Sequence, residues 1–535
     1  MTFDLNQYPY PSKRQCVFAK NGMVATSQPL AAQAGLDILK KGGNAIDAAI
    51  ATAACLTVVE PTSNGIGSDC FAIVWMQNAL YGLNASGYAP KNISIDQLQA
   101  LGYEKIPTHG MIPITIPGTP KGWVALSKRF GKLPLSDVLE PAIQYANEGF
   151  PLSQTLAYHW KQAYEIYKKN LTDPMFQPWF DTFAPHGAAP KVGDIWSSKD
   201  HAETLRCIAE TNADAFYNGT LTKKIVDYSN KYGGFLSLED FAEYDVDWVT
   251  PISINYKGYD VYELPPNGQG IIPLMALSML NNDQFTSRDN TETVHHQIEA
   301  LKLAFADGFE YIADHKEMQV TDKHLLNAHY LKKRRDLISK DALDPMFGQP
   351  QKGGTVYLAT ADKDGNMVSY IQSNYMGFGS GIVIPGTGIA MQNRGHNFSF
   401  DKHHINALGP RKKPLHTIIP GFLMKDQLPI GPFGVMGGFM QPQGHLQVLM
   451  NMIDFNLNPQ AALDAPRFQW MKDKNVIVEP SFPKHVIQDL ILRGHQVTVE
   501  ERISMFGRGQ IIFRDINGTY IGASESRCDG MVAAW

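Results

Sequence analysis

Thr355 is the residue whose type and position point most directly to catalysis. It follows Gly353 and Gly354 and lies in the stretch GTVYLATADKDGNMVSYIQSN. A threonine hydroxyl is a weak nucleophile that needs a base beside it, and the α-amine of the same residue supplies one if Thr355 becomes an N-terminus. An α-amine titrates at about 7.7–8.0, so roughly a tenth of it is neutral and accepts a proton at pH 7. Cleavage before Thr355 would therefore activate the chain.

The histidines, the Gly-rich turn and the cysteines do not form a metal, nucleotide or disulfide pattern. The histidines have neither HExxH spacing nor an evident carboxylate partner, so they are interpreted as structural or surface residues, and no metal site is expected. The turn TSNGIGSD lacks the ending of a P-loop and the full GxGxxG pattern, which argues against nucleotide binding. An odd number of cysteines without CxxC spacing predicts reduced thiols. The histidines considered are His295, His296, His396, His403 and His404.

The elements that must position Thr355 are predicted from hydrophobic periodicity. Residues 30–61 read as an amphipathic helix and an Ala-rich helix, followed by the strand CFAIVW. Most segments in 133–314 read as helices, whereas the sequence from Thr355 onward reads as a hairpin with a turn at 362–365. Later segments include the predicted strands GIVIPGTGIAMQN, LHTIIPGFLMK and QIIFRD and the helix GHLQVLMNMIDF. This order favours an α+β fold of layered sheets enclosed by helices.

Composition limits the class of protein. The 535 residues are 44% hydrophobic and 19% charged, with a net charge of −5. These values are typical of a globular chain and argue against a nucleic-acid partner. The apolar stretch 45–59 is too short to span a bilayer and contains Asp47, so no membrane association is expected. A secretory signal is not evident, which predicts a cytoplasmic location.

Many ordered blocks along the chain resemble the gamma-glutamyltransferase family, also called gamma-glutamyltranspeptidases or glutathione hydrolases. The resemblance also extends to a subgroup with cephalosporin-acylase-like members. The blocks include GMVATSQPLAAQAGLDILKKGGNAIDAAIATA, VVEPTSNGIGSD, IPGTPKGW, GKLPLSDVLEPAIQYANEGFPLS, TLRCIAETNADAFYNG, GGFLSLEDFAEYDVDW, YELPPNGQG, FGSGIV, GPRKKPLHTIIP, LDAPRF and GASESR.

The resemblance implies a four-layer αββα sandwich of the N-terminal-nucleophile hydrolase type. It implies cleavage between Gly354 and Thr355, giving a large subunit of residues 1–354 and a small subunit of residues 355–535 within one intertwined catalytic domain. Thr355 would be the nucleophile, Ser373 would support it, and the N–H groups of Gly437 and Gly438 would form the oxyanion hole. No cofactor is expected, because proton transfer and oxyanion stabilisation suffice for this chemistry.

The expected acyl-binding residues depart from the family pattern. Family members bind the α-carboxylate of a γ-glutamyl group with an arginine and its α-ammonium with an acidic residue. The corresponding positions here are Ser86 and Asn397, while a neighbouring polar position has become Arg394. This exchange favours an acyl group with a bare carboxylate, such as glutaryl. An arginine that has no ligand role is the alternative interpretation of Arg394.

Three further residues are expected in the substrate site. His416 and Thr417 occupy the position of the family's Ser-Ser pair, which contacts the glutamyl carboxylate. Tyr375 follows Ser373 by two residues.

The sequence therefore predicts a self-processing threonine amidohydrolase or acyltransferase acting on small amides of γ-glutamyl or related dicarboxylic acyl groups. A glutaryl-cephalosporin-acylase-like amidase with little γ-glutamyl activity is one alternative. A pseudoenzyme that never matures and acts as a binding protein is another. The expected assembly is a heterodimer of the chain's own two fragments, with or without further oligomerisation.

Overall fold

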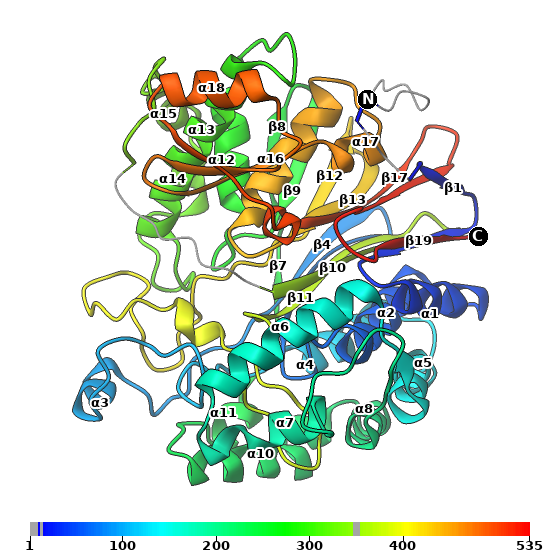
Figure 1. The fold of residues 1–535 in the computed structure, drawn as a ribbon. Helices are drawn as coiled ribbons and strands as arrows, with labels where there is room; N and C mark the ends of the chain where they lie inside the picture. The colour runs from blue at the N-terminus through cyan, green and yellow to red at the C-terminus, as the bar shows by residue number, and fades with distance from the viewer. Residues whose placement is uncertain (1–8, 11–13, 346–353) are drawn as a thin grey trace.

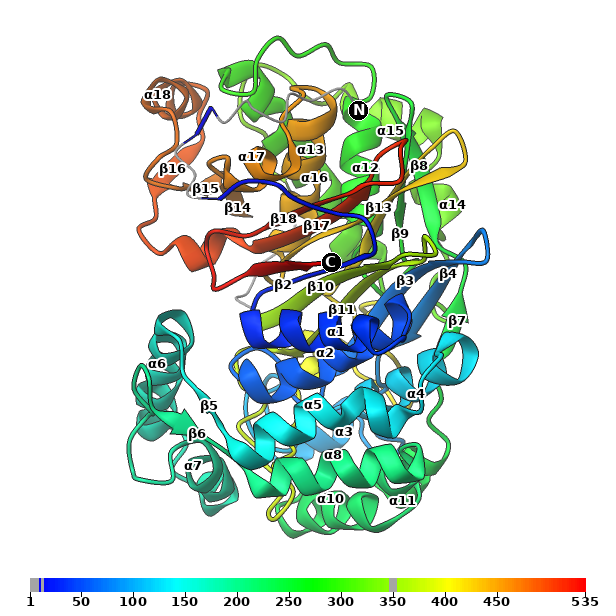
Figure 2. The same cartoon turned by 90° about the vertical axis from the view of Figure 1, so that its right-hand side faces the viewer.

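Two seven-stranded antiparallel sheets lie face to face at the centre of the molecule (Figures 1 and 2). The structure is a computed structural model that describes residues 9–10, 14–345 and 354–535. The β10 sheet contains, in spatial order, β19 (Met531–Ala534), β2 (Gly22–Thr26), β10 (Gly354–Asp362), β11 (Met367–Tyr375), β3 (Asp69–Met76), β4 (Ala79–Ala85) and β7 (Asp247–Val249). The β13 sheet contains β1 (Val17–Ala19), β18 (Tyr520–Ser524), β17 (Arg508–Arg514), β13 (Leu428–Met436), β12 (Gly421–Lys425), β9 (Tyr259–Glu263) and β8 (Ile252–Tyr256).

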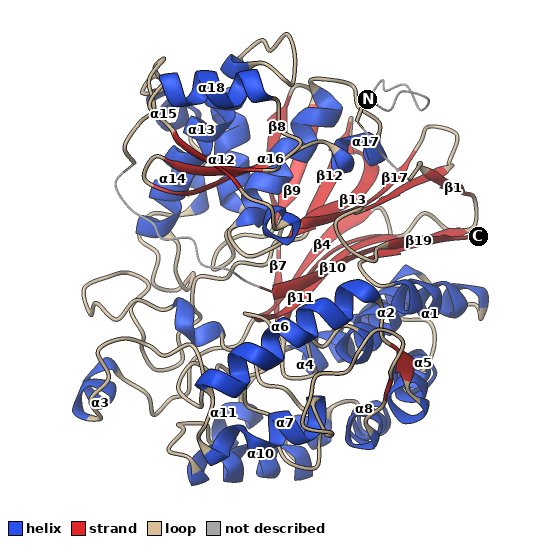
Figure 3. Ribbon diagram, in the orientation of Figure 1, coloured by secondary structure: helices blue, strands red, loops and turns tan. Residues whose placement is uncertain are grey.

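Helices cover the outer face of each sheet, as the colouring by secondary structure makes clear (Figure 3). On the β10 side are α1 (Pro29–Lys40), α2 (Ala45–Val59), α3 (Ile95–Ala100), α4 (Thr119–Phe130), α5 (Leu135–Glu148), α6 (Gln154–Asn170), α7 (Gln177–Phe183), α8 (Lys199–Thr211), α9 (Asp214–Tyr217), α10 (Thr220–Lys231) and α11 (Leu238–Ala242). On the β13 side are α12 (Ile271–Leu280), α13 (Thr291–Tyr311), α14 (Asp322–Leu325), α15 (Ala328–Arg335), α16 (Met440–Ile453), α17 (Pro459–Asp464) and α18 (Lys484–Leu492). The result is the predicted αββα sandwich.

Three apolar cores hold these layers together. One lies between the β10 sheet and its helices, another between the β13 sheet and its helices, and a third between the two sheets. Helix α2 shows why the first core forms: all its residues are buried, and its small alanines allow close packing on β10 and β11. A capping box of Asn44 and Asp47 starts this helix.

Shorter elements complete the fold. A three-stranded sheet contains β14 (Phe468–Lys472), β15 (Asn475–Val478) and β16 (Gln496–Val499), and a two-stranded ribbon contains β5 (Phe150–Pro151) and β6 (Ile195–Trp196). Single-turn 3₁₀ helices span Pro174–Phe176, Arg394–Asn397 and Ile503–Phe506. Among the described residues, no helix is long and apolar enough to cross a membrane.

Several predicted elements are confirmed and others are wrong. The two helices after residue 29, the strand β3 and the hairpin β10–β11 occur where they were predicted. The segment GIVIPGTGIAMQN is not a strand as predicted; it forms turns and isolated bridges, because Gly381, Gly386 and Gly388 adopt positive φ angles that bend the chain. The mainly helical stretch also contains the strands β7–β9, which the helical pattern of the surrounding segments concealed.

Candidate active site

Thr355 is the second residue of β10, and its side chain lies inside the sandwich. The residue is fully buried, and its Oγ1 lies 3.1 Å from Oγ of Ser373 on the neighbouring strand β11. The backbone N–H of Tyr375 donates to Ser373 Oγ at 2.8 Å. Gly354 and Thr355 are consecutive residues of β10, so this is the geometry of the uncut chain.

A β-bulge brings the two hydroxyls together. Gly354 pairs with Tyr375, but Val356 pairs with Gln372, so β11 has one more residue than β10 between these pairs. A bulge bends the strand locally and changes the direction of its side chains. The strand pattern predicted the hairpin but not this extra residue, which sets the local position of Ser373 opposite Thr355.

Arg394 points inward and is fully buried close to this hairpin. Its guanidinium carbon lies 4.5 Å from the centre of the Tyr375 ring, and its Nη1 donates to Thr417 Oγ1 at 2.7 Å. Its Nε lies 3.7 Å from Asp69 Oδ2, which is too long for a hydrogen bond. Within the described part of the chain, Nε and Nη2 have no hydrogen-bond partner. Burial lowers the pKa of Arg394 to about 10, against the opposing effect of Asp69, so the group stays charged at neutral pH.

Asp69 is an acidic residue of this region that the sequence analysis did not single out. Its Oδ2 lies 3.0 Å from His416 Nε2, and the N–H of Gly87 donates to its Oδ1 at 3.1 Å. The N–H of Ile418 donates to Nδ1 of His416, so the proton of this imidazole is on Nε2 and is donated to Asp69. Burial raises the pKa of Asp69 to about 7 while Arg394 opposes that shift, and burial lowers the pKa of His416. The sequence signal for Asp69 was a single acid at the start of an apolar strand.

Gly437 and Gly438 connect β13 to α16, with φ angles of 138° and 62°. In the described part of the chain, their N–H groups have no protein acceptor, so both are available as donors. Gln269, also missed from the sequence, joins this turn to the Arg394 region: its Nε2 donates to Thr417 O at 2.5 Å and to Gly438 O at 3.0 Å.

The ends of the strands place this turn on the Thr355 side of the sandwich. Strands β12 and β13 are antiparallel, so the start of β12, near Thr417, and the end of β13, near Gly437, lie at the same end of their sheet. A chain of contacts thus runs from Thr355 through Ser373, Tyr375, Arg394, Thr417 and Gln269 to Gly438, with His416 next to Thr417 in the sequence.

Ser86 does not contact Arg394 directly. It is buried just after β4, where its hydroxyl donates to Asn84 Oδ1 at 2.7 Å and accepts from Asn267 Nδ2 at 3.2 Å. Ser86 is therefore held in a neutral hydrogen-bond network with Asn84 and Asn267.

Asn397 ends the 3₁₀ helix Arg394–Asn397, three residues after Arg394. Its side-chain amide donates to Leu415 O at 2.9 Å, and the residue lines a cavity of about 240 Å³ together with Phe439. This cavity lies beside the glycine turn, since Phe439 directly follows Gly438.

The turn TSNGIGSD, residues 62–69, is hydrogen-bonded to β11. Ser68 Oγ donates to Asn374 Oδ1 at 2.8 Å, and Gln372 Nε2 donates to Asn64 Oδ1 at 2.6 Å. Its side chains are thus engaged in holding the bulged strand. These bonds give the turn a structural role, in agreement with the prediction that it is not a P-loop.

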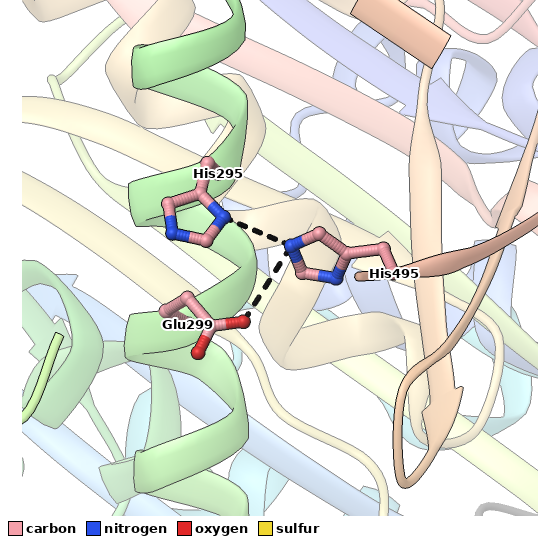
Figure 4. Close-up of side chains that lie close together, drawn as sticks. All are labelled: His295, Glu299 and His495. Atoms are coloured by element: carbon pink, nitrogen blue, oxygen red, sulfur yellow. Dashed lines mark hydrogen bonds and ion pairs between the residues drawn. The ribbon is translucent and has the colours of Figure 1, made fainter. Parts of the chain in front are cut away.

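A second group of ionisable side chains joins α13, which carries His295 and Glu299, to His495 between α18 and β16 (Figure 4). His295 Nδ1 is 2.9 Å from His495 Nε2, and Glu299 Oε1 is 3.6 Å from the same nitrogen. Two imidazoles on one tetrahedral zinc stand about 3.3 Å apart, so the shorter separation is that of a hydrogen bond. Lys302 Nζ also lies 2.8 Å from the Glu299 carboxylate and is wholly buried with it. The group is therefore a hydrogen-bonded network containing an ion pair.

Comparison with known proteins agrees with the architecture. A model of the gamma-glutamyltranspeptidase family matches residues 31–535. The chain belongs to the gamma-glutamyltranspeptidase family. It is therefore an enzyme with the fold of N-terminal-nucleophile hydrolases, and the resemblance seen in the sequence blocks is confirmed.

Individual relatives of this gamma-glutamyltranspeptidase-family enzyme carry different names. The crystal structure of a cephalosporin acylase from Bacillus halodurans is 59% identical with a TM-score of 0.96, and the match covers 100% of this chain and 99% of that one. A glutathione hydrolase-like YwrD proenzyme from Bacillus subtilis is 37% identical over 96% of this chain and 98% of its own length. An Acylase ACY 1 proenzyme from Pseudomonas sp. is 32% identical over 96% of this chain and 93% of its own length.

Proposed function

We propose that this enzyme is a self-processing amide hydrolase in which Thr355 is the nucleophile and Arg394 binds a carboxylate at the far end of the acyl group. The observation that carries the proposal is the buried guanidinium of Arg394, whose Nε and Nη2 have no hydrogen-bond partner among the described residues. A guanidinium fork matches a carboxylate through two parallel hydrogen bonds. Tyr375 and Thr417 hold the fork in place.

Self-processing starts with Thr355 Oγ1 attacking the carbonyl carbon of Gly354. The peptide C–N bond breaks as the acyl group moves from nitrogen to oxygen, and the nitrogen gains a proton. Water then hydrolyses the ester, giving a carboxylate on Gly354 and a free amine on Thr355. Glycine before the cut suits this step because the absence of Cβ permits strained backbone geometry. The products are a large subunit, 1–354, and a small subunit, 355–535.

Turnover uses the same hydroxyl. The free amine of Thr355 accepts the proton of Oγ1 as the oxygen attacks the substrate amide, and the amine leaving group takes a proton as it departs. The N–H groups of Gly437 and Gly438 bind the oxyanion, and one such donor contributes about 3–4 kcal/mol. Ser373 holds Thr355 in position. Water releases the acyl group, whereas an incoming amine gives transfer.

Two acyl groups meet the requirement for a terminal carboxylate. Glutaryl is favoured by the exchange of charges at Ser86, Asn397 and Arg394, and the 59% identical structure is named a cephalosporin acylase. γ-Glutamyl is the second candidate. It is favoured by Asp69, an acid beside Arg394, and by the name of the Bacillus subtilis relative. His416 acts here as a neutral donor to Asp69 rather than as a direct ligand of the acyl group.

The partners in this proposal are small-molecule amides and the two fragments of the chain itself, which remain associated after cleavage. A cytoplasmic location and any further oligomerisation stay predictions from the sequence.

The carboxylate requirement is tested with two anilides of equal chain length, glutaryl and pentanoyl, which differ only in the terminal carboxylate. Arg394→Met should lower kcat/KM for the glutaryl anilide about 100-fold and leave the pentanoyl anilide nearly unchanged, because a charge-assisted contact is lost. Arg411→Met, a change to a partly exposed arginine, is the control. Retention of the glutaryl preference by Arg394→Met would contradict the proposal.

A further inference from the structure

Asp69, Ser373 and Thr355 form a row across three neighbouring strands. Asp69 of β3 is in direct register with Ser373 of β11, and Ser373 contacts Thr355 of β10. Residues directly opposite each other in an antiparallel pair project to the same face of the sheet. Adjacent strands are about 4.8 Å apart, so Asp69 lies about 10 Å from Thr355 along this row.

That separation suits a five-carbon acyl group. A nucleophile approaches a carbonyl carbon at about 3 Å. The four bonds from the carbonyl carbon of a γ-glutamyl group to its α-nitrogen span about 5 Å when extended, given bonds of about 1.5 Å. A hydrogen bond from this nitrogen to a carboxylate adds about 3 Å. The α-nitrogen of a γ-glutamyl group bound to Thr355 therefore reaches the neighbourhood of Asp69.

The charge near this position is balanced in the uncut chain. Asp69 is fully buried, with Oδ2 3.7 Å from Nε of Arg394. An acyl group with only a carboxylate places a second negative charge beside this pair and competes with Asp69 for Arg394. An acyl group that also carries an ammonium keeps the pocket neutral, and its ammonium has Asp69 as a partner.

We propose that Asp69 is a specificity-determining residue, whose carboxylate favours acyl groups that carry an ammonium beside the carboxylate bound by Arg394 and disfavours acyl groups that carry a carboxylate alone. The inference rests on the proposed function, because it assumes that Arg394 binds the acyl carboxylate. The exchange at Ser86 and Asn397 alone favoured a glutaryl group. Asp69 of β3 changes that expectation, because it supplies the negative charge for an ammonium that Asn397 lacks.

The test is the ratio of kcat/KM for γ-glutamyl anilide to that for glutaryl anilide at a pH above 8. Asp69→Asn keeps the shape of the side chain and removes its charge. The ratio should fall at least about tenfold. Turnover of γ-glutamyl anilide should decrease because its ammonium loses an ion pair with Asp69, and turnover of glutaryl anilide should increase because its carboxylate is no longer repelled by Asp69. Asp240→Asn, which changes an equally buried carboxylate in the capping box of α11, should alter both substrates by the same factor.

A ratio that stays within about twofold of wild type, including an equal loss of both activities, would overturn the role of Asp69. If Asp69→Asn does not cut itself, residues 1–354 and a small chain that begins at Thr355 are co-expressed and purified as a complex before the assay. Failure of the proposed function is recognised separately, since Arg394→Met would then keep its preference for glutaryl over pentanoyl anilide whatever residue occupies position 69.

Discussion

The hydroxyl pair of Thr355 and Ser373 is the smallest unit of this site. Ser373 Oγ accepts the N–H of Tyr375, which orients it toward Thr355 Oγ1. A weak nucleophile benefits from such a fixed position, because effective attack depends on both distance and direction. Ser373 therefore acts as a positioning residue for the nucleophile.

Replacing Ser373 with alanine should slow both self-cleavage and substrate turnover by about 10- to 100-fold, because Thr355 loses its hydroxyl partner. The appearance of fragments on a denaturing gel and kcat of the separated enzyme measure the two effects. Ser369→Ala is a matched control, since Ser369 lies on the same strand and its hydroxyl contacts Tyr357 instead, at 2.8 Å. Cleavage of Ser373→Ala at the wild-type rate would contradict this role.

Asp69 also predicts a pH dependence at the residue scale. Burial raises its pKa to about 7, although Arg394 opposes this shift, so Asp69 is protonated below that pH and charged above it. The ratio of γ-glutamyl to glutaryl kcat/KM should therefore rise as the pH increases from about 6 to about 8, and it should stay flat in Asp69→Asn. Titration of the Thr355 amine affects both substrates and cancels in the ratio. A rise of equal size in the variant would assign the effect to another group.

Several other ionisable groups lie near Asp69, and any effect that they have on the ratio without Asp69 persists in Asp69→Asn. They are Arg394, His416 and Lys413, together with Cys70, Tyr217 and Tyr244.

Helix α13 holds the chain that leads toward the cleavage site. His295 Nε2 donates to Ser339 O at 2.8 Å, and the N–H of Leu343 donates to Glu299 Oε2 at 2.9 Å. Lys302 Nζ donates to Leu343 O at 3.0 Å. The buried ion pair of Glu299 and Lys302 therefore fixes residues 339–343 on the helical layer of the β13 sheet.

Glu299→Ala should lower stability by about 3–5 kcal/mol, because it leaves the buried ammonium of Lys302 without its counter-charge. Adding Lys302→Met should recover much of the loss, which a thermal melt of each variant measures. Asp336→Ala removes the exposed pair with Lys332 on α15 and should change stability by less than about 1 kcal/mol. A single variant Glu299→Ala as stable as wild type would show that the pair is not required.

At the element scale, the sequence predicted the helices and strands that follow from the local pattern of apolar residues. Ala45–Val59 is helical and buried on all sides. The alternation of the hairpin correctly predicted two strands, although β11 is buried on both faces and not on one. The bulge at Ser373 was not predictable, because it depends on how β11 fits between β10 and β3. The short strands β7–β9 were missed because they lie between helical segments.

At the scale of the whole molecule, both sheets combine strands from the two sides of Thr355. Strands β10 and β11 lie between β2 and β3 in one sheet, and β12 and β13 join β9 and β17 in the other. Breaking the bond before Thr355 removes none of these pairings. The two fragments should therefore remain together in native conditions and separate only in denaturant.

The predicted site residues came from two sources. Thr355 stood out by its position after two glycines, whereas Ser373 and the Gly437–Gly438 turn followed from the family resemblance. The inward direction of Arg394 was an open question that the structure answers. Asp69 and Gln269 were missed because their neighbours come from distant segments: His416 lies 347 residues from Asp69 in the chain. Their importance depends on tertiary contacts that periodicity does not encode.

The central claim is that cleavage before Thr355 produces the nucleophile, and intact-mass analysis after incubation tests it most directly. The 59.4 kDa chain should convert to two fragments, the smaller beginning at Thr355, while Thr355→Ala stays whole with an unchanged circular dichroism spectrum. Residues 1–354 co-expressed with a small chain that begins at Thr355 should give an active complex, and the same co-expressed pair with Ala at position 355 should be inactive. A wild-type chain that stays whole, or an active pair with Ala at position 355, would contradict the account.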